Sequence, residues 1–231
     1  MEEFIDSRNS EIWELLSKNY KFKIENSQNE EYSCFTKNSE AIIYVVPNKI
    51  SKDSFTHELL HIYLKYKEFY LGSSIKNFIR GDETLQFLLS ENLLEHIGNC
   101  LDHLKMFEIY IDLGFEKKEF LYDFELFKCS KDELNRITKH FKYFGNVNPN
   151  AIDFYIGKLI AILCDPNEEN DYTKELLEFK ELDFELYEIV NNLVAETKKF
   201  DIEKNDFLNS YRDISSTFYH NLKNWTIIKL N

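Results

Sequence analysis

Cysteines are few in this sequence, and none of them are close together. The four are Cys34, Cys100, Cys129 and Cys164, and no two form a Cys-x-x-Cys pair. The sequence therefore provides neither a zinc knuckle of thiolates nor the dense disulfide framework of a small secreted domain. We expect all four to be reduced thiols.

The sequence also lacks long apolar runs and a secretory leader. Its longest apolar stretches, 41–47 and 156–164, are far shorter than the ~20 residues that cross a bilayer. The first eight residues are acidic and include no apolar signal-peptide core. These absences predict a cytoplasmic protein with no membrane-spanning segment.

Basic residues are in deficit. Lys and Arg total 28 against 41 Asp and Glu, which gives a formal net charge of -13. A field of this sign repels phosphate backbones and anionic lipid surfaces. We expect neither nucleic acid nor a membrane to be a partner, although a net charge does not describe how charge is distributed.

Proline and glycine are scarce as well, with 3 and 6 residues, which favours a mainly helical chain with few tight turns. Hydrophobic residues make up 43% of the sequence, enough for a sizeable core. We predict strands at 32–36 and 41–46 and a polar loop at 73–82. The predicted helices are 6–19, a helix from Ser51 or Asp53 to about Phe69, 83–113, 117–143, 151–164, 179–198 and 205–225.

This pattern predicts an α+β protein that is predominantly helical, with a small N-terminal sheet packed on a helix and a helical C-terminal lobe. The clearest break is the segment 145–150, Gly-Asn-Val-Asn-Pro-Asn. We therefore expect a region 1–145 and a helical lobe 146–231, packed on each other as one compact unit.

The segment 57–61 carries the clearest chemical signal, and its sequence is His-Glu-Leu-Leu-His. Residues four apart lie on the same face of a helix, so His57 and His61 can bind one Zn²⁺ ion together. Glu58 is offset by about 100° from His57 and can act as general base toward a water that the ion activates. Apolar neighbours predict that this helix is buried on most of its circumference, where unsatisfied histidines would be costly.

The arrangement resembles the zincin superfamily of zinc metallopeptidases, in which a helix bearing His-Glu-x-x-His follows strands of a small sheet. The resemblance covers Ala41 to about Tyr70, and it implies peptidase activity and a third ligand from a later helix. The metzincin extension is absent, because Leu64 and Lys67 occupy its Gly and His positions. The resemblance is closer to gluzincins, which use a glutamate as third ligand.

A third ligand is expected from the helix that contains residues 91–103. Its polar residues fall on one arc, which either faces solvent or lines a cleft. Glu95, near the middle of the acidic part of this arc, is the first choice, with His96 and Glu91 as alternatives. Asn99 or Asp102 would then hold the free N–H of a ligand. The Glu-x-x-x-Asp pattern of gluzincins is missing here, because Asn99 follows Glu95 at that spacing.

Catalysis also requires a donor that stabilises the oxyanion. His103 and Tyr110 are the candidates, and Tyr155 is a weaker one. The competing interpretation is that each of these side chains only packs, since the chain has 14 Tyr.

Three functions are compatible with these residues. The first is a zinc metallopeptidase that hydrolyses a peptide bond in a narrow intracellular protein target, with Glu58 as general base. The second is a regulatory or partner-binding helical protein whose zinc site is structural or vestigial. The third is a metal-dependent hydrolase of a substrate other than a peptide, because the chemistry at the metal is the same.

Overall fold

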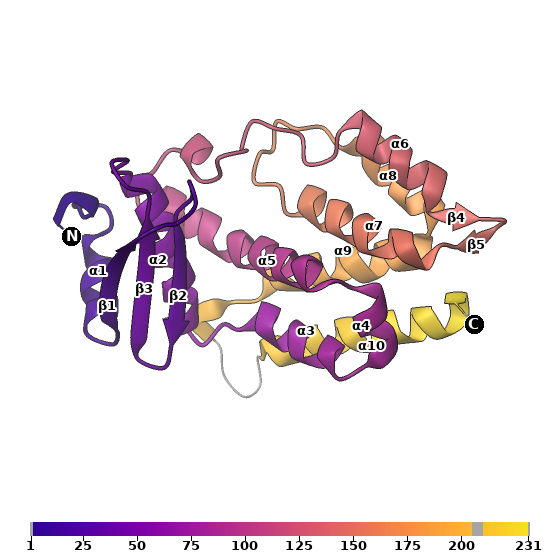
Figure 1. Cartoon of the computed structure of the whole chain (residues 1–231), viewed down its shortest axis with the longest axis horizontal. Helices are drawn as coiled ribbons and strands as arrows, with labels where there is room; N and C mark the ends of the chain where they lie inside the picture. Colours follow the sequence, from indigo (N-terminus) through magenta and orange to yellow (C-terminus); the bar gives the residue numbers. More distant parts are fainter. Residues whose placement is uncertain (1, 205–209, 231) are drawn as a thin grey trace. The chain divides into compact units, whose positions relative to one another are not determined.

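Figure 1 shows a computed structural model of the chain, which describes residues 2–204 and 210–230. The described residues form ten α-helices, three short 3₁₀-helices and two small sheets. The predicted class, α+β and predominantly helical with a small N-terminal sheet, is confirmed. Among the described residues, no helix combines the length and apolar composition that crossing a bilayer requires.

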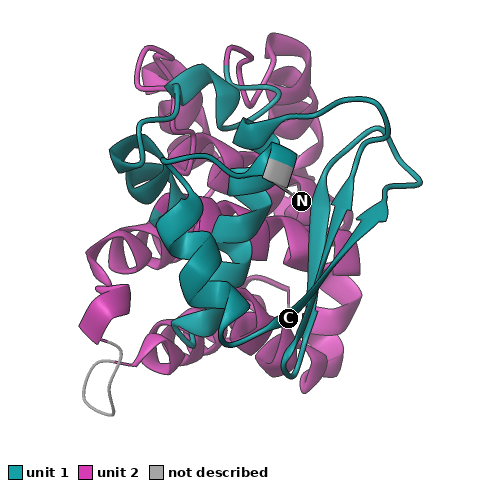
Figure 2. Ribbon diagram, turned by 90° about the vertical axis from the view of Figure 1, so that its left-hand side faces the viewer, with its two compact units in different colours: residues 1–69, 105–124 teal, residues 70–104, 125–231 magenta. Residues whose placement is uncertain are grey.

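The chain forms two compact units, which Figure 2 distinguishes by colour. Unit 1 consists of residues 1–69 and 105–124, and unit 2 consists of residues 70–104 and 125–231. Helix α5 (Glu91–Asp112) is continuous and contributes to both, with Lys105 as its first residue in unit 1. Gly145, where we predicted the boundary, lies inside unit 2.

The sheet of unit 1 contains β1 (Lys21–Asn26), β2 (Ser33–Lys37) and β3 (Glu40–Val45) in the order β1-β3-β2. Strand β1 is parallel to β3, and β2 is antiparallel to it. The two predicted strands are confirmed as β2 and β3. Strand β1 was not predicted; its Phe22 and Ile24 alternate with lysines and are only half-buried.

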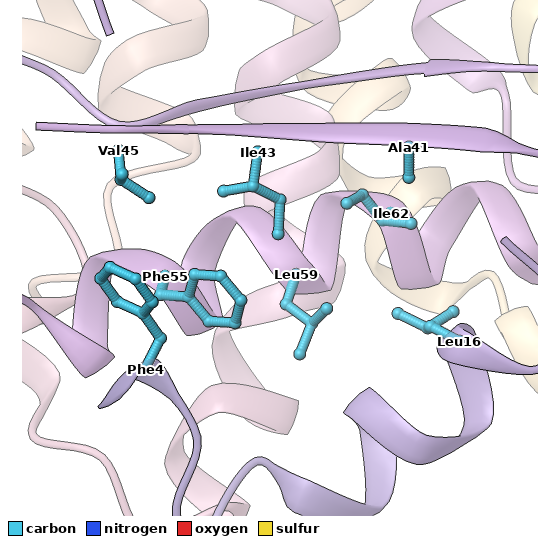
Figure 3. Close-up of a cluster of buried hydrophobic side chains, with 8 residues drawn as sticks. All are labelled: Phe4, Leu16, Ala41, Ile43, Val45, Phe55, Leu59 and Ile62. Atoms are coloured by element: carbon cyan, nitrogen blue, oxygen red, sulfur yellow. The ribbon is translucent and has the colours of Figure 1, made fainter. Parts of the chain in front are cut away.

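Helix α2 (Lys52–Tyr66) packs against this sheet and is the predicted metal-binding helix. It begins after Ser51, whose hydroxyl accepts a hydrogen bond from the backbone N–H of Ser54 at 3.0 Å. Ser51 is thus the cap, one of the two positions that the sequence left open, Ser51 and Asp53. Figure 3 shows how one face of α2 meets β3, with the 3₁₀-helix Glu2–Phe4 and α1 (Ser10–Ser17) closing the cluster. The buried side chains are Phe4, Leu16, Ala41, Ile43, Val45, Phe55, Leu59 and Ile62. Burial of each large one contributes roughly 1.5–3 kcal/mol, so this face fixes the rotation of α2 about its axis.

Unit 2 is helical. Besides the first part of α5 it contains α3 (Leu71–Arg80), α4 (Glu83–Leu88), α6 (Lys131–His140), α7 (Pro149–Leu163), α8 (Thr173–Leu182), α9 (Phe184–Lys199) and α10 (Tyr211–Leu230). A short hairpin, β4 (Lys142–Tyr143) with β5 (Asn146–Val147), joins α6 to α7. Tyr155 is buried in this unit, and its hydroxyl donates to the carbonyl oxygen of Phe179 at 2.7 Å.

Several predicted elements differ from the structure. The predicted loop 73–82 is wrong, because α3 occupies it; Leu71, Ile75 and Ile79 form a buried stripe four residues apart. The predicted helix 83–113 is interrupted at Ser90, whose backbone N–H donates to the carboxylate of Asp153 at 2.7 Å. The predicted helix 117–143 is limited to a 3₁₀-helix, Lys117–Glu119, and to α6. Residues 205–209 of the last predicted helix lie outside the described residues, and α10 covers its remainder from Tyr211.

Candidate metal centre

Helix α2 presents His57 and His61 side by side, one turn apart. Their ring centroids are 5.1 Å apart and the ring planes meet at 65°. Both residues are partly buried, in contrast to the fully buried Leu59 and Leu60 between them. The two imidazoles therefore lie together on the side of α2 that faces away from β3.

A third imidazole, that of His103 on α5, joins this pair. One ring nitrogen of each of the three histidines lies within 4.8 Å of the corresponding atoms of the other two. His57, His61 and His103 can therefore hold one metal ion, and all three are partly buried. The sequence pointed to His103 as an oxyanion donor, whereas the structure places it with the two motif histidines.

The part of α5 that follows His103 packs on α2 inside unit 1. His103, Phe107 and Tyr110 are spaced i, i+4 and i+7, so they share one face of α5. The Phe107 and Tyr110 rings each lie 5.1 Å from the ring of Phe120. The Tyr110 hydroxyl donates a hydrogen bond to Asp53, in the first turn of α2, at 3.3 Å. These contacts hold the end of α5 against α2, and the next turn of the same helix carries His103.

His57 is held in the neutral form that binds metal ions. Burial, and to a lesser degree the charge of His61, lower the pKa of His57 from 6.5 to about 3, against the opposing effect of a hydrogen bond with the backbone of Phe120. The Phe120 ring lies 4.9 Å from the imidazole. The Nδ1 atom of His57 is itself buried. A neutral imidazole in a group of three fits a metal ion.

The lowered pKa of His57 predicts how the metal-free protein responds to acid. Between about pH 6.5 and 3 the unfolded chain binds a proton at His57 that the folded chain does not, so the free energy of unfolding falls as the pH falls. The slope from this residue approaches about 1.4 kcal/mol per pH unit. We expect the His57→Gln variant, without metal, to lose stability less steeply than the unaltered protein.

Urea denaturation at several pH values in this window, with a chelator present, measures the slope. His140→Gln, a change at an exposed histidine of α6, is the matched control and should leave the slope unchanged. Equal slopes for His57→Gln and the unaltered protein would contradict the account of this histidine.

Glu58 lies beside the imidazoles and is also buried, with 9% of its surface exposed. Burial raises the pKa of its carboxyl group above the usual 4.5, while the nearby charge of His61 and a hydrogen bond from the thiol of Cys34 oppose the shift. Cys34 belongs to β2, which packs on α2. This partner of Glu58 could not be predicted, because Cys34 lies in a strand with no motif of its own.

The first-choice third ligand, Glu95, does not join the histidines. Its side chain is exposed, and Lys76 of α3 donates a hydrogen bond to its carboxylate at 3.1 Å. Glu95 precedes His103 by eight residues, which is about 12 Å along the helix axis. We therefore propose His103 in its place.

The two alternative ligands lie in the same exposed part of α5. Glu91 forms ion pairs with Lys76 at 2.7 Å and with Arg80 at 3.0 Å. A ring nitrogen of His96 lies 3.2 Å from the carbonyl oxygen of Gly157, as a donor to it. Each of these side chains contacts other helices of unit 2 instead of the pair on α2.

The remaining predicted site residues have varied surroundings. Asp102 is buried, whereas Asn99 is exposed. Tyr110 is fully buried, and burial together with the Asp53 carboxylate raises the pKa of its hydroxyl well above the usual range. The contacts of Tyr110 stabilise the packing of α5 on α2, and its hydroxyl donates a hydrogen bond to Asp53.

Comparison of the chain with protein-family models, with curated proteins and with solved structures finds no match. The features that bear on function are therefore the three histidines, the buried carboxyl group next to them and the helices that position these groups.

Proposed function

We propose that this protein is a zinc metallopeptidase in which His57, His61 and His103 bind the ion and Glu58 is the general base. The observation that supports this most strongly is the convergence of three imidazole nitrogens within 4.8 Å, with a buried carboxyl group in the same motif. Three protein ligands are the number found in catalytic zinc sites, whereas structural sites are closed by four.

Zinc is favoured by the chemistry of the donors. Neutral imidazoles suit zinc and several other divalent transition metals, whereas magnesium and calcium require oxygen ligands. The helical His-Glu-x-x-His spacing is the arrangement that zinc peptidases use. When bound, such an ion acts as a Lewis acid toward a carbonyl group and makes a bound water more acidic.

The protein's own residues supply the proton transfer and its positioning. Glu58 can accept a proton and return it to a leaving group, and its raised pKa brings it nearer the operating pH, where acid–base catalysis is most efficient. The Cys34 thiol donates a hydrogen bond to this carboxyl group and restrains its orientation. His57 stays neutral and keeps a lone pair for the ion.

The substrate class is tested by offering the zinc-loaded protein a library of cellular peptides and a panel of small esters and amides. Peptide cleavage that stops with a chelator and returns with zinc supports the proposal. Turnover of esters alone would indicate a hydrolase that does not act on peptides. Stoichiometric zinc without any turnover would contradict a hydrolytic function and favour a structural metal.

A further inference from the structure

The β4–β5 hairpin of unit 2 exposes two neighbouring aromatic rings at its turn. Tyr143 is 70% exposed and Phe144 is 91% exposed, and their ring centroids lie 4.6 Å apart in an edge-on arrangement. Phe144 has a φ of 49°, which is rare for a bulky residue, and Gly145 follows with a φ of 86°. Strained, exposed aromatic residues of this kind point to a surface that functions by contact.

Further exposed apolar residues lie at the same end of unit 2, where Figure 1 shows the hairpin and the C-terminal end of α10. Ile227 and Ile228 of α10 are 54% and 70% exposed, and α10 packs on β5. Ile227 also lines a pocket of about 330 Å³ together with Pro149, which follows the hairpin, and the exposed Phe87 of α4. We call residues 134–152, which contain the hairpin, together with Phe87, Ile227 and Ile228 the hairpin end.

The charge of the hairpin end is opposite to that of the whole chain. Residues 134–152 contain no Asp or Glu, although the chain has 41 of them, and include Arg136, Lys139 and Lys142, a local charge of +3 with His140 neutral. Lys139 and Lys142 are exposed and form no ion pair within the described residues. A basic, aromatic surface thus lies on a protein whose net charge is -13.

We propose that the hairpin end is a docking surface for an anionic lipid bilayer. Aromatic side chains prefer the boundary between headgroups and acyl chains, and lysines next to them contact lipid phosphates. Exposed Ile227 and Ile228 favour lipid over single-stranded nucleic acid, because aliphatic side chains cannot stack on bases.

The net negative charge does not prevent this contact. At physiological ionic strength the screening length is about 8 Å, so charges on distant faces have little effect at the contact. The proposal is independent of the metal centre, since none of its residues belongs to that site.

Co-sedimentation of the full chain with phosphatidylcholine vesicles, with and without phosphatidylglycerol, tests the proposal. We expect binding only to the anionic vesicles, and weaker binding as salt is raised. Two double variants should each lower the partition coefficient at least ~10-fold. Lys139→Glu with Lys142→Glu removes basic residues, each of which contributes measurably to binding near an anionic surface. Tyr143→Ser with Phe144→Ser removes the aromatic side chains that prefer the boundary between headgroups and acyl chains.

Matched changes elsewhere serve as controls. Tyr122→Ser removes an aromatic side chain of unit 1 that is 94% exposed. Lys23→Glu with Lys37→Glu reverses two exposed charges on the sheet of unit 1. These variants should bind as the unaltered protein does. Absence of vesicle binding, equal binding to neutral vesicles, or equal losses in the control variants would overturn the proposal. The proposal would also be overturned if the protein bound oligothymidylate or self-associated, and if the hairpin variants lost that property and not vesicle binding.

Discussion

Glu58→Gln is expected to lower kcat/KM by ~10²–10⁴-fold, the usual contribution of a general base, while the zinc content stays unchanged. Glutamine has the shape of glutamate but cannot accept a proton at neutral pH. The carboxyl group of Glu58 is buried between the Cys34 thiol and the motif histidines and is not among the three grouped ligands, so its removal should spare the ion.

Kinetics on the cleaved substrate and elemental analysis of the same preparations measure both parts of this prediction. Glu14→Gln, at an exposed position of α1, is the control for loss of a carboxylate in unit 1. Retention of full activity by Glu58→Gln would show that Glu58 is not the general base. Loss of zinc from this variant would show that the carboxylate is a ligand.

His103→Ala is expected to weaken zinc binding by at least ~100-fold, whereas Glu95→Ala should leave it unchanged. Even the loss of a partner that only orients a ligand weakens metal binding ~10–100-fold, and removal of a ligand has a larger effect. His103 belongs to the group of three histidines, while Glu95 is exposed and paired with Lys76.

Competition with a chromophoric chelator gives the two affinities, and circular dichroism shows whether each variant is folded. His96→Ala is a second control, since this exposed histidine lies on the same helix. A loss of affinity in Glu95→Ala but not in His103→Ala would restore the glutamate ligand that the gluzincin resemblance implied.

The helix that carries the motif could be predicted from local features. Ser51 or Asp53 was expected at its start, and the apolar residues around the histidines predict its burial. The placement of His57 and His61 on one face then follows from helix geometry. Helix α3 was not predicted because its sequence is mostly polar, with Ser73, Ser74 and Lys76. Its buried apolar residues are only Leu71, Ile75 and Ile79, which lie four residues apart.

The position of His103 beside His57 and His61 could not be predicted because it depends on long-range packing. Periodicity shows which residues of α5 share a face, but not which turn of α5 lies opposite α2. That turn is selected by Phe107 and Tyr110 packing on Phe120. Phe120 was predicted to lie in a long helix but follows a short 3₁₀-helix instead. The i, i+4, i+7 spacing of His103, Phe107 and Tyr110 was the one available signal.

X-ray absorption at the zinc edge of the zinc-loaded full chain tests the central claim most directly. The account predicts one zinc ion per chain, nitrogen or oxygen neighbours at about 2.0–2.1 Å, and the outer scattering of three imidazole rings. A sulfur neighbour at about 2.3 Å, fewer than three imidazoles, or no stoichiometric zinc would contradict a centre built from His57, His61 and His103.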